Sequence, residues 1–325
     1  MMTTREMAIA RTVIYSSLFD YPLTLDELHR SLIESDQTAA EILAVYEGSA
    51  ALQHIVEYRD GYFLPIGRSD LPAERRRRER RSREFLRHHQ LLLRLVCAVP
   101  FTRLVALSGS IAHLNLEANG DLDLFIVTRG SSVWTVTVAV LAIAKLLRRR
   151  RSLCANFIIA DTHLRLDQRD LFAANQVIHL RPLIGGDVWS VMVANNPFVA
   201  RFHPNAALHP AHRPVPIDVA PGAFSIVKSL FELALTLPLP IIEGLSRRLY
   251  AWHLRRRSGS WRSPDQVQLR SDYLKLHTQS HRQSVLERFE AAVERACRAE
   301  ASGEVSYNER DAKAAAHKRS LRAVS

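Results

Sequence analysis

The stretch that most constrains the fold lies at residues 104–128, where two short apolar runs are separated by polar residues. The first run, at 104–107, is partly β-branched and too short for a helix, which predicts a buried strand. It ends abruptly at 108–110, a Ser-Gly-Ser sequence, and the second run covers 124–127. The pattern therefore predicts two strands joined by a short polar segment.

Two aspartates, Asp121 and Asp123, open the second run directly after the turn signal Asn119-Gly120. Residues two apart on a strand project from the same face. Neighbouring carboxylates at the start of a buried strand repel each other and resist desolvation. A divalent cation between them relieves both costs, and Mg²⁺ prefers carboxylate oxygens together with substrate phosphates. We therefore predict that Asp121 and Asp123 are metal ligands.

Gly109-Ser110, followed after ten residues by Asp121-x-Asp123 and an apolar strand, resembles the signature of the polymerase-β-like nucleotidyltransferase superfamily. The resemblance implies that Gly109 and Ser110 contact a triphosphate and that the two aspartates hold two Mg²⁺ ions. Glycine lets the backbone approach a phosphate closely, and amide groups at a helix start attract anions. The alternative is a turn serine with turn or N-capping aspartates in an ordinary α/β domain.

The sequence departs from this family pattern at the third carboxylate, which members supply from a later strand and which often helps to deprotonate the attacking hydroxyl. The predicted strand at 153–160 carries Asn156 in its middle, and the first acid after it is Asp161. An asparagine oxygen can ligate Mg²⁺ but cannot act as a general base. Either Asp161 reaches back, or two carboxylates and metal suffice, or the site binds nucleotide without turnover. Asn156 is equally consistent with a buried amide that bonds the backbone.

These features predict an α/β (α+β) protein with a nucleotidyltransferase-type core built on a small mixed sheet. The predicted segments are a winged-helix-like domain at 1–70, an Arg-rich connecting helix at 71–99, the core at 100–205, a helical C-terminal region at 206–301 and a disordered tail at 302–325. Within the core, Ser132 is expected to cap a helix at 133–147, and Leu153–Ala160 is the third strand.

The N-terminal segment resembles a winged-helix domain because three helices precede a hairpin centred on Asp60-Gly61. Thr24 and Thr38, each followed three residues later by glutamate, predict capping boxes that open the second and third helices. The third helix is acidic and has no lysine or arginine, although base readout and phosphate contacts need such side chains. We therefore favour protein contact or substrate positioning over DNA binding.

The stretch from Ala73 to Val99 lacks glycine and proline and predicts one helix that ends before Pro100. Its first half is rich in arginine. Two interpretations stay open: a solvated connecting helix whose side-chain stems cover neighbouring surface, or an electrostatic track for a polyanion.

The most apolar segment is 224–242, which carries Lys228, Glu232, Pro238 and Pro240. A charge pair and two prolines argue against a membrane-spanning helix. The aromatic and Arg-rich flank up to residue 257 is typical of a membrane interface. We favour a buried helix that covers the core, with peripheral membrane contact through 224–252 as the alternative.

The composition is that of a folded protein, with 47% hydrophobic and 24% charged residues. A net charge of +11 favours anionic partners. Cys97, Cys154 and Cys297 are far apart without metal-ligand spacing, which indicates a reducing compartment. No secretory signal is evident at the N-terminus, and we expect a cytoplasmic protein.

By resemblance, the expected activity is Mg²⁺-dependent transfer of a nucleotidyl group from an NTP to an unidentified acceptor hydroxyl. Two alternatives remain at this point. One is a catalytically inactive nucleotide sensor on the same fold, suggested by the missing third acid. The other is a regulator that binds nucleic acid through the N-terminal domain and the Arg-rich helix.

Overall fold

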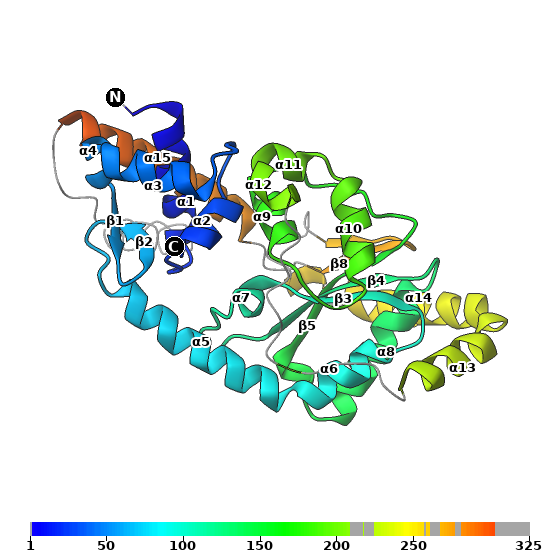
Figure 1. Cartoon of the computed structure of the whole chain (residues 1–325). Coiled ribbons are helices and arrows are strands. Elements are labelled where there is room, and N and C mark those ends of the chain that lie inside the picture. Colours follow the sequence, from blue (N-terminus) through cyan, green and yellow to red (C-terminus); the bar gives the residue numbers. More distant parts are fainter. Residues whose placement is uncertain are drawn as a thin grey trace.

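A computed structural model describes residues 2–208, 217, 224–256, 258–260, 267–276 and 281–302. It is an α+β protein in which helices surround a six-stranded mixed sheet, with a smaller helical unit beside it (Figure 1). The predicted tail beyond Ser302 lies outside the described residues.

The N-terminal unit contains the predicted three helices and hairpin, with one extra helical turn. Its elements are α1 (Thr4–Ser17), α2 (Leu25–Arg30), α3 (Ala39–Gly48), α4 (Ala50–Gln53), β1 (Val56–Arg59) and β2 (Tyr62–Pro65). Both predicted capping boxes are confirmed, because Thr24 and Thr38 each accept the backbone N–H of the glutamate three residues later. Asp60 and Gly61 both have positive φ, which a two-residue hairpin turn needs. The winged-helix resemblance stays a prediction.

The predicted single helix at 73–99 is wrong, because the chain forms α5 (Leu71–His88) and α6 (Gln90–Cys97) with a break at His89. The buried ring of His89 stacks on Phe85 with centroids 4.1 Å apart, and its Nδ1 donates to the Phe85 carbonyl at 2.8 Å. These contacts hold His89 at φ −102° and ψ 9°, outside helical geometry.

The sheet has the strand order β6-β3-β4-β5-β8-β7. Its strands are β3 (Thr102–Leu107), β4 (Leu122–Thr128), β5 (Leu153–Ala160), β6 (Arg181–Ile184), β7 (Val267–Leu269) and β8 (Tyr273–Leu276). Only β4 and β5 run parallel, and the other neighbours are antiparallel. The three strands predicted from sequence are present, and three short strands at the sheet margins were missed.

Helices cover both faces of the sheet. On one face, α6, α8 (Val133–Leu146) and α14 (Leu239–Arg255) share a core with the alternate side chains of β3 and β4. The other face is covered by α9 (Leu171–Ile178) and α10 (Gly186–Ala194). The short helices α11 (Phe198–Phe202) and α12 (Pro204–Leu208) lead back toward α2. Single 3-10 turns lie at Arg150–Ser152 and Ser258–Ser260.

Segment 206–301 is divided among three places and includes two strands. Helix α13 (Phe224–Thr236) pairs with α14 in a hairpin at the end of the core remote from the N-terminus, β7 and β8 extend the sheet, and α15 (Arg282–Ser302) packs against α1 (Figure 1). The ring of Phe289 on α15 meets Tyr15 on α1 edge to face, with centroids 5.3 Å apart. Among the described residues, none of the helices has the length and apolar character needed to cross a bilayer.

The inner face of α5 joins the N-terminal unit to the core through buried arginines. Arg75 donates to both carboxylate oxygens of Glu27, at 2.7 and 2.8 Å. Its guanidinium lies 4.3 Å from the centre of the Tyr21 ring, and it also donates to the Pro22 carbonyl. This ion pair is nearly excluded from water. The outward arginines of α5 are exposed, so the electrostatic-track interpretation stays a prediction.

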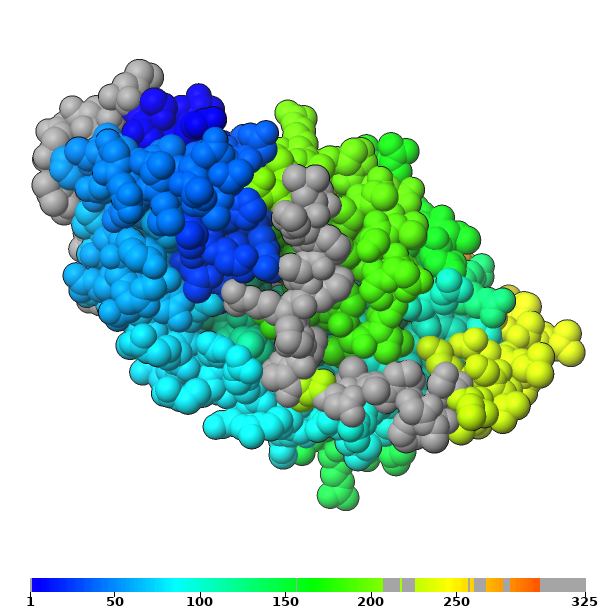
Figure 2. Space-filling view, in the orientation of Figure 1, coloured from blue at the N-terminus to red at the C-terminus, as the bar shows by residue number. Residues whose placement is uncertain are grey.

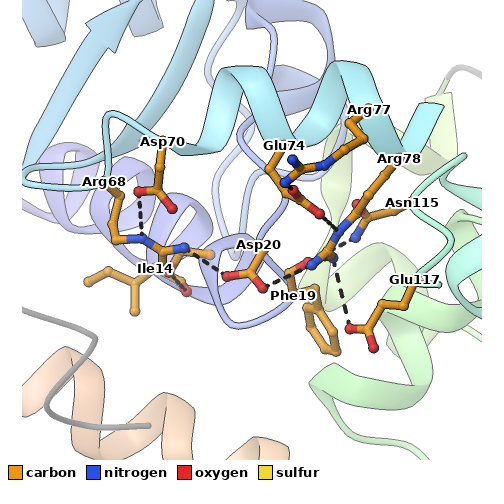
Figure 3. Close-up of polar contacts among 11 residues, drawn as sticks. Ile14, Phe19, Asp20, Arg68, Asp70, Glu74, Arg77, Arg78, Asn115 and Glu117 are labelled. Atoms are coloured by element: carbon orange, nitrogen blue, oxygen red, sulfur yellow. Dashed lines mark hydrogen bonds and ion pairs between the residues drawn. The ribbon is translucent and has the colours of Figure 1, made fainter. Parts of the chain in front are cut away.

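A second network connects α5 to the loop that precedes Asp121 (Figure 3). Asp20 accepts from Arg68 at 2.8 Å and from Arg78 at 3.2 Å. The carbonyl of Phe19 accepts from Arg78 at 3.3 Å and from the Asn115 side chain at 2.8 Å. These bonds therefore connect the N-terminal unit to the chain segment that precedes the aspartate pair.

Candidate metal and nucleotide site

The two predicted metal ligands lie together at the start of β4, as the sequence indicates. Asp121 is the residue before the strand, and Asp123 is its second residue. Together with Cys154 of β5 they offer three ligand atoms that all lie within 4.8 Å of one another. All three side chains are half-buried. The part of the chain that the structure describes contains no second cluster of this kind.

Asp123 is in an environment that disfavours its negative charge. Burial, and to a smaller extent the neighbouring charge of Asp121, raise the pKa of Asp123 to about 7. This is the repulsion and desolvation expected of paired carboxylates without a counterion. A cation between the two carboxylates would remove that cost, so the electrostatics of the pair favour a bound metal.

Gly109 contacts this cluster directly. It has φ +61°, a conformation that side chains other than glycine rarely adopt. A Cβ atom at this position would lie 2.3 Å from Oδ2 of Asp123, far inside van der Waals distance. The backbone N–H of Ser108 donates to the Asp123 carbonyl at 3.0 Å. Glycine therefore lets the backbone of the turn lie directly against the carboxylate, and the predicted juxtaposition of Gly109 with Asp123 is present.

Cys154 occupies the place on β5 next to the pair, and sequence reasoning missed it. The parallel register pairs Asp123 with Cys154, and the Cys154 Sγ lies 2.6 Å from Oδ2 of Asp121. In a parallel pair the starts of both strands lie at the same end of the sheet, so the register of β4 and β5 brings Cys154 beside the aspartates. The residue predicted from sequence on this strand was Asn156, two positions further on, and the structure does not describe its side chain.

Asp161 is not brought to the cluster. Its backbone N–H donates to the carbonyl of Thr128 at the far end of β4, roughly 20 Å along the strands from Asp121. Its carboxylate accepts the N–H of Gly130 at 2.8 Å, so it stabilises the turn after β4. The possibility that Asp161 reaches back to the metal pair is therefore excluded by this geometry.

A cavity of about 560 Å³ opens beside the Gly-Ser turn, between the N-terminal unit and the core. Gly109, Ser110 and Gly120 form its wall near the cluster, and α1, α9, α15 and the chain segments 18–23 and 113–119 supply most of the rest. A smaller cavity of about 330 Å³ shares His113 and Tyr21 in its wall and is also lined by Arg181. Gly109 thus contacts both the Asp123 carboxylate and a space large enough for a nucleotide-sized ligand.

Arg181 lies close to the Gly-Ser turn. It begins β6 and pairs with Leu107, so it lies beside the strand end from which the Gly-Ser turn departs. The rings of His113 and His179 lie nearby in a tilted arrangement, with centroids 4.2 Å apart. Burial lowers the pKa of His179 to about 4, and it lowers the pKa of His113 far below its usual value. Both rings are neutral at physiological pH.

The donor set suits Mg²⁺ in part. Two carboxylates are appropriate for Mg²⁺, which normally completes its shell with waters and substrate phosphates. A thiol is a soft ligand that suits Zn²⁺ better, and it has little affinity for Mg²⁺. The carboxylate pair with Gly109 therefore fits a Mg²⁺–nucleotide complex, whereas all three donors together fit a softer metal.

Comparison of the chain with protein-family models, with curated proteins and with solved structures finds no match. The geometry of the cluster and the cavity beside it therefore carries the functional argument.

Proposed function

We propose that this protein is a nucleotide-binding member of the polymerase-β-like nucleotidyltransferase superfamily that transfers a nucleotidyl group from an NTP to an acceptor hydroxyl. The observation that carries the proposal is the contact of Gly109 with Asp123, where a Cβ atom would lie 2.3 Å from the carboxylate. In the superfamily that the sequence resembles, the turn and the aspartates hold the same metal–triphosphate complex, so this meeting of turn and carboxylate supports the proposal. The strand pattern of β3, β4 and β5 agrees with the predicted small mixed sheet.

In this proposal Asp121 and Asp123 hold the metal, and the Gly109 backbone with the Ser110 hydroxyl positions the triphosphate. Arg181 adds positive charge at the same strand end, where it would offset phosphate charge. Bound Mg²⁺ supplies neutralisation of the triphosphate and lowers the pKa of the acceptor hydroxyl. The N-terminal unit forms one side of the cavity and so contributes to positioning of nucleotide or acceptor. A cytoplasmic location, where NTPs and Mg²⁺ are available, belongs to the same proposal.

One observation favours the second candidate, a nucleotide sensor without turnover. The strand β5 contains no carboxylate, and Cys154 takes the place beside the pair. A thiol that bonds Asp121 is a poor substitute for the third carboxylate that superfamily members use. The sensor would keep the same metal and nucleotide ligands.

The test is calorimetric titration of NTPs into the full chain with and without Mg²⁺, with Mn²⁺ and Zn²⁺ as comparison ions. We expect Mg²⁺-dependent NTP binding that falls at least tenfold in Asp121→Asn and in Asp123→Asn. Asp161→Asn is the matched control, because that carboxylate lies at the opposite end of the strands, and it should bind like the wild type. Unchanged binding in both cluster variants would refute the metal assignment.

Turnover separates the two candidates. The enzyme would incorporate label from an α-labelled NTP into at least one member of a panel of sugar, lipid, protein, antibiotic and RNA acceptors. The sensor would bind Mg²⁺–NTP with no incorporation, and Cys154→Asp, which restores a carboxylate on β5, would then be the variant expected to gain activity.

A further inference from the structure

The hairpin formed by α13 and α14 turns three charged side chains, Lys228, Glu232 and Glu243, toward the core. Apolar residues of the same hairpin, among them Leu239 and Ala251, also pack against the core. Lys228 Nζ donates to the carbonyl and hydroxyl oxygens of Thr102 at 2.7 and 2.8 Å. Glu232 accepts the backbone N–H of Phe101 at 2.8 Å. The predicted burial of this segment therefore holds for one side of the hairpin only.

Glu243 fixes the second helix of the hairpin. It is 8% exposed, and its carboxylate accepts the backbone N–H groups of Trp134 and Thr135 at 2.9 and 2.7 Å. These N–H groups are the unpaired donors at the start of α8, which the predicted cap Ser132 does not satisfy. The hairpin is thus anchored to the core by polar contacts.

The outer side of the same hairpin is apolar. Ten of the sixteen large apolar side chains that are exposed in the described chain lie on it: Ile226, Val227, Leu230, Phe231, Leu233, Leu237, Ile241, Leu245, Leu249 and Trp252. Exposure is greatest around the turn between the helices, where Leu237 is 89% and Leu233 and Ile241 are each 76% exposed. This turn protrudes at the end of the molecule opposite the N-terminal unit (Figures 1 and 2). Patches of this kind mark interaction sites.

The exposed charges of the hairpin are all positive. Both acids of segment 224–256 are used in the inward contacts described above, and its four arginines, Arg247, Arg248, Arg255 and Arg256, are all exposed. The Arg256 guanidinium lies 3.8 Å from the centre of the Trp252 ring, and both lie at the end of α14 away from the tip. An apolar tip followed by arginine and tryptophan is the pattern of a membrane interface.

The dimensions agree with insertion into one leaflet. Arg248 lies nine residues after Leu239, the first residue of α14, which corresponds to about 14 Å of rise. One leaflet of a bilayer has a hydrocarbon depth of about 15 Å, half of the full core. With Leu237 in the acyl region, Arg248 and the residues after it would lie at the headgroups. Helices of 13 and 17 residues are too short to span the bilayer but suffice for this depth.

We propose that the outer face of the α13–α14 hairpin binds the surface of an anionic lipid bilayer, with the tip around Leu237 inserted and the α14 arginines on the headgroups. Pairing with a second copy through the same face would bring these arginines against one another without any carboxylate, which disfavours association. The residues 303–325 are basic and contain few large apolar side chains, so they do not complement the face either. An anionic membrane satisfies both the apolar tip and the arginines.

The test is flotation of the full chain with vesicles of phosphatidylcholine alone and of phosphatidylcholine mixed with phosphatidylglycerol. We expect binding to the anionic vesicles that weakens with added salt and is at least tenfold weaker on neutral vesicles. Leu237→Glu should reduce binding to anionic vesicles about tenfold or more. Arg248→Gln with Arg255→Gln should reduce it by about fivefold for each arginine.

Val191→Glu is the matched control, since Val191 is an exposed apolar residue on α10, on the other face of the sheet. It should bind vesicles like the wild type, and circular dichroism should show native helix content in every variant. The proposal is overturned if the wild type does not float with anionic vesicles, or if Leu237→Glu floats equally well. It is also overturned if sedimentation without lipid shows a dimer that Leu237→Glu dissociates.

Discussion

Helix α5 and the α13–α14 hairpin both turn charged side chains inward, but toward different partners. Helix α5 buries Arg75 and Arg78 against the N-terminal unit, whereas the hairpin exposes Leu233, Leu237 and Ile241. Both segments lie beside the same core, and both contradict the expectation that arginines lie outside and leucines inside. The difference is in the partners: the buried arginines of α5 meet carboxylates, whereas the inward charges of the hairpin meet backbone groups of the core.

This comparison shows that the burial of a residue depends on what the neighbouring element offers. Glu27 presents both carboxylate oxygens to Arg75, so the buried guanidinium keeps its hydrogen bonds. In the hairpin, Lys228 donates to the Thr102 carbonyl, and Glu243 accepts a backbone N–H at the start of α8. Its inward charges therefore bond polar backbone groups of the core. The following predictions measure how much each inward contact contributes.

The largest effect is expected from Arg75→Met, which leaves Glu27 as a buried, uncompensated carboxylate. Removal of one partner from a buried ion pair costs about 3 to 5 kcal/mol. Urea denaturation should show this loss in the free energy of unfolding. Arg80→Met is the matched control, because Arg80 lies on the exposed side of the same helix and should change stability by less than about 0.5 kcal/mol. If both variants lose the same free energy of unfolding, the buried arginine of α5 contributes no more to stability than the exposed one.

Acid should destabilise the N-terminal unit's contact with α12 through His203. Burial first, and then the nearby His179, lower the pKa of His203 to about 3, while its bonds to the backbone of Ser31 and Leu32 act in the opposite direction. An unfolded histidine has a pKa of about 6.5, so the unfolded state binds the extra proton and stability falls as the pH drops below that value. At about pH 5 the loss is about 2 kcal/mol from this residue.

The check is the free energy of unfolding at about pH 7.5 and 5 for the wild type and His203→Asn. The asparagine side chain retains a donor for the Ser31 carbonyl, which His203 Nδ1 contacts at 3.0 Å. The variant should lose about 2 kcal/mol less than the wild type over this pH interval. A pH profile identical to that of the wild type would show that the pKa of His203 is the same in the folded and in the unfolded state.

The sequence predicted those parts of the molecule that depend on local pattern. The strands β3, β4 and β5, both capping boxes and the Asp60-Gly61 hairpin follow from residue order alone. The meeting of Gly109 with Asp123 was also predicted, since a resemblance ties the turn to the pair. These features are decided within about twenty residues of chain.

Features that depend on distant neighbours were missed. The place of Cys154 depends on the parallel register of β4 and β5, which no local pattern specifies. The start of α8 was expected to be capped by Ser132 and is instead capped by Glu243, more than one hundred residues later. The exposed face of the hairpin was predicted to be buried because an apolar segment usually is, and only the tertiary contacts of Lys228 and Glu243 show which face turns inward.

Within the hairpin, Glu243→Gln should cost about 1 to 2 kcal/mol of stability. The amide has one acceptor oxygen in place of two, so it cannot keep the bonds to both Trp134 and Thr135 and it introduces an NH₂ group beside backbone donors. Thermal and urea denaturation should both show the loss. If the free energy of unfolding is unchanged, other groups bond the first N–H groups of α8. The inward contact of Glu243 would then contribute nothing to stability.

The smallest effect on folding is expected at the outer face, where Leu245→Gln should change the free energy of unfolding by less than about 0.5 kcal/mol. Leu245 lies two residues after Glu243 on the same helix, but its side chain is 57% exposed, so little apolar contact is lost. The pair of substitutions therefore compares a buried acid with an exposed leucine at nearly the same place. A loss as large as that of Glu243→Gln would show that another part of the chain covers Leu245 in solution, and the contrast between α5 and the hairpin would then fail.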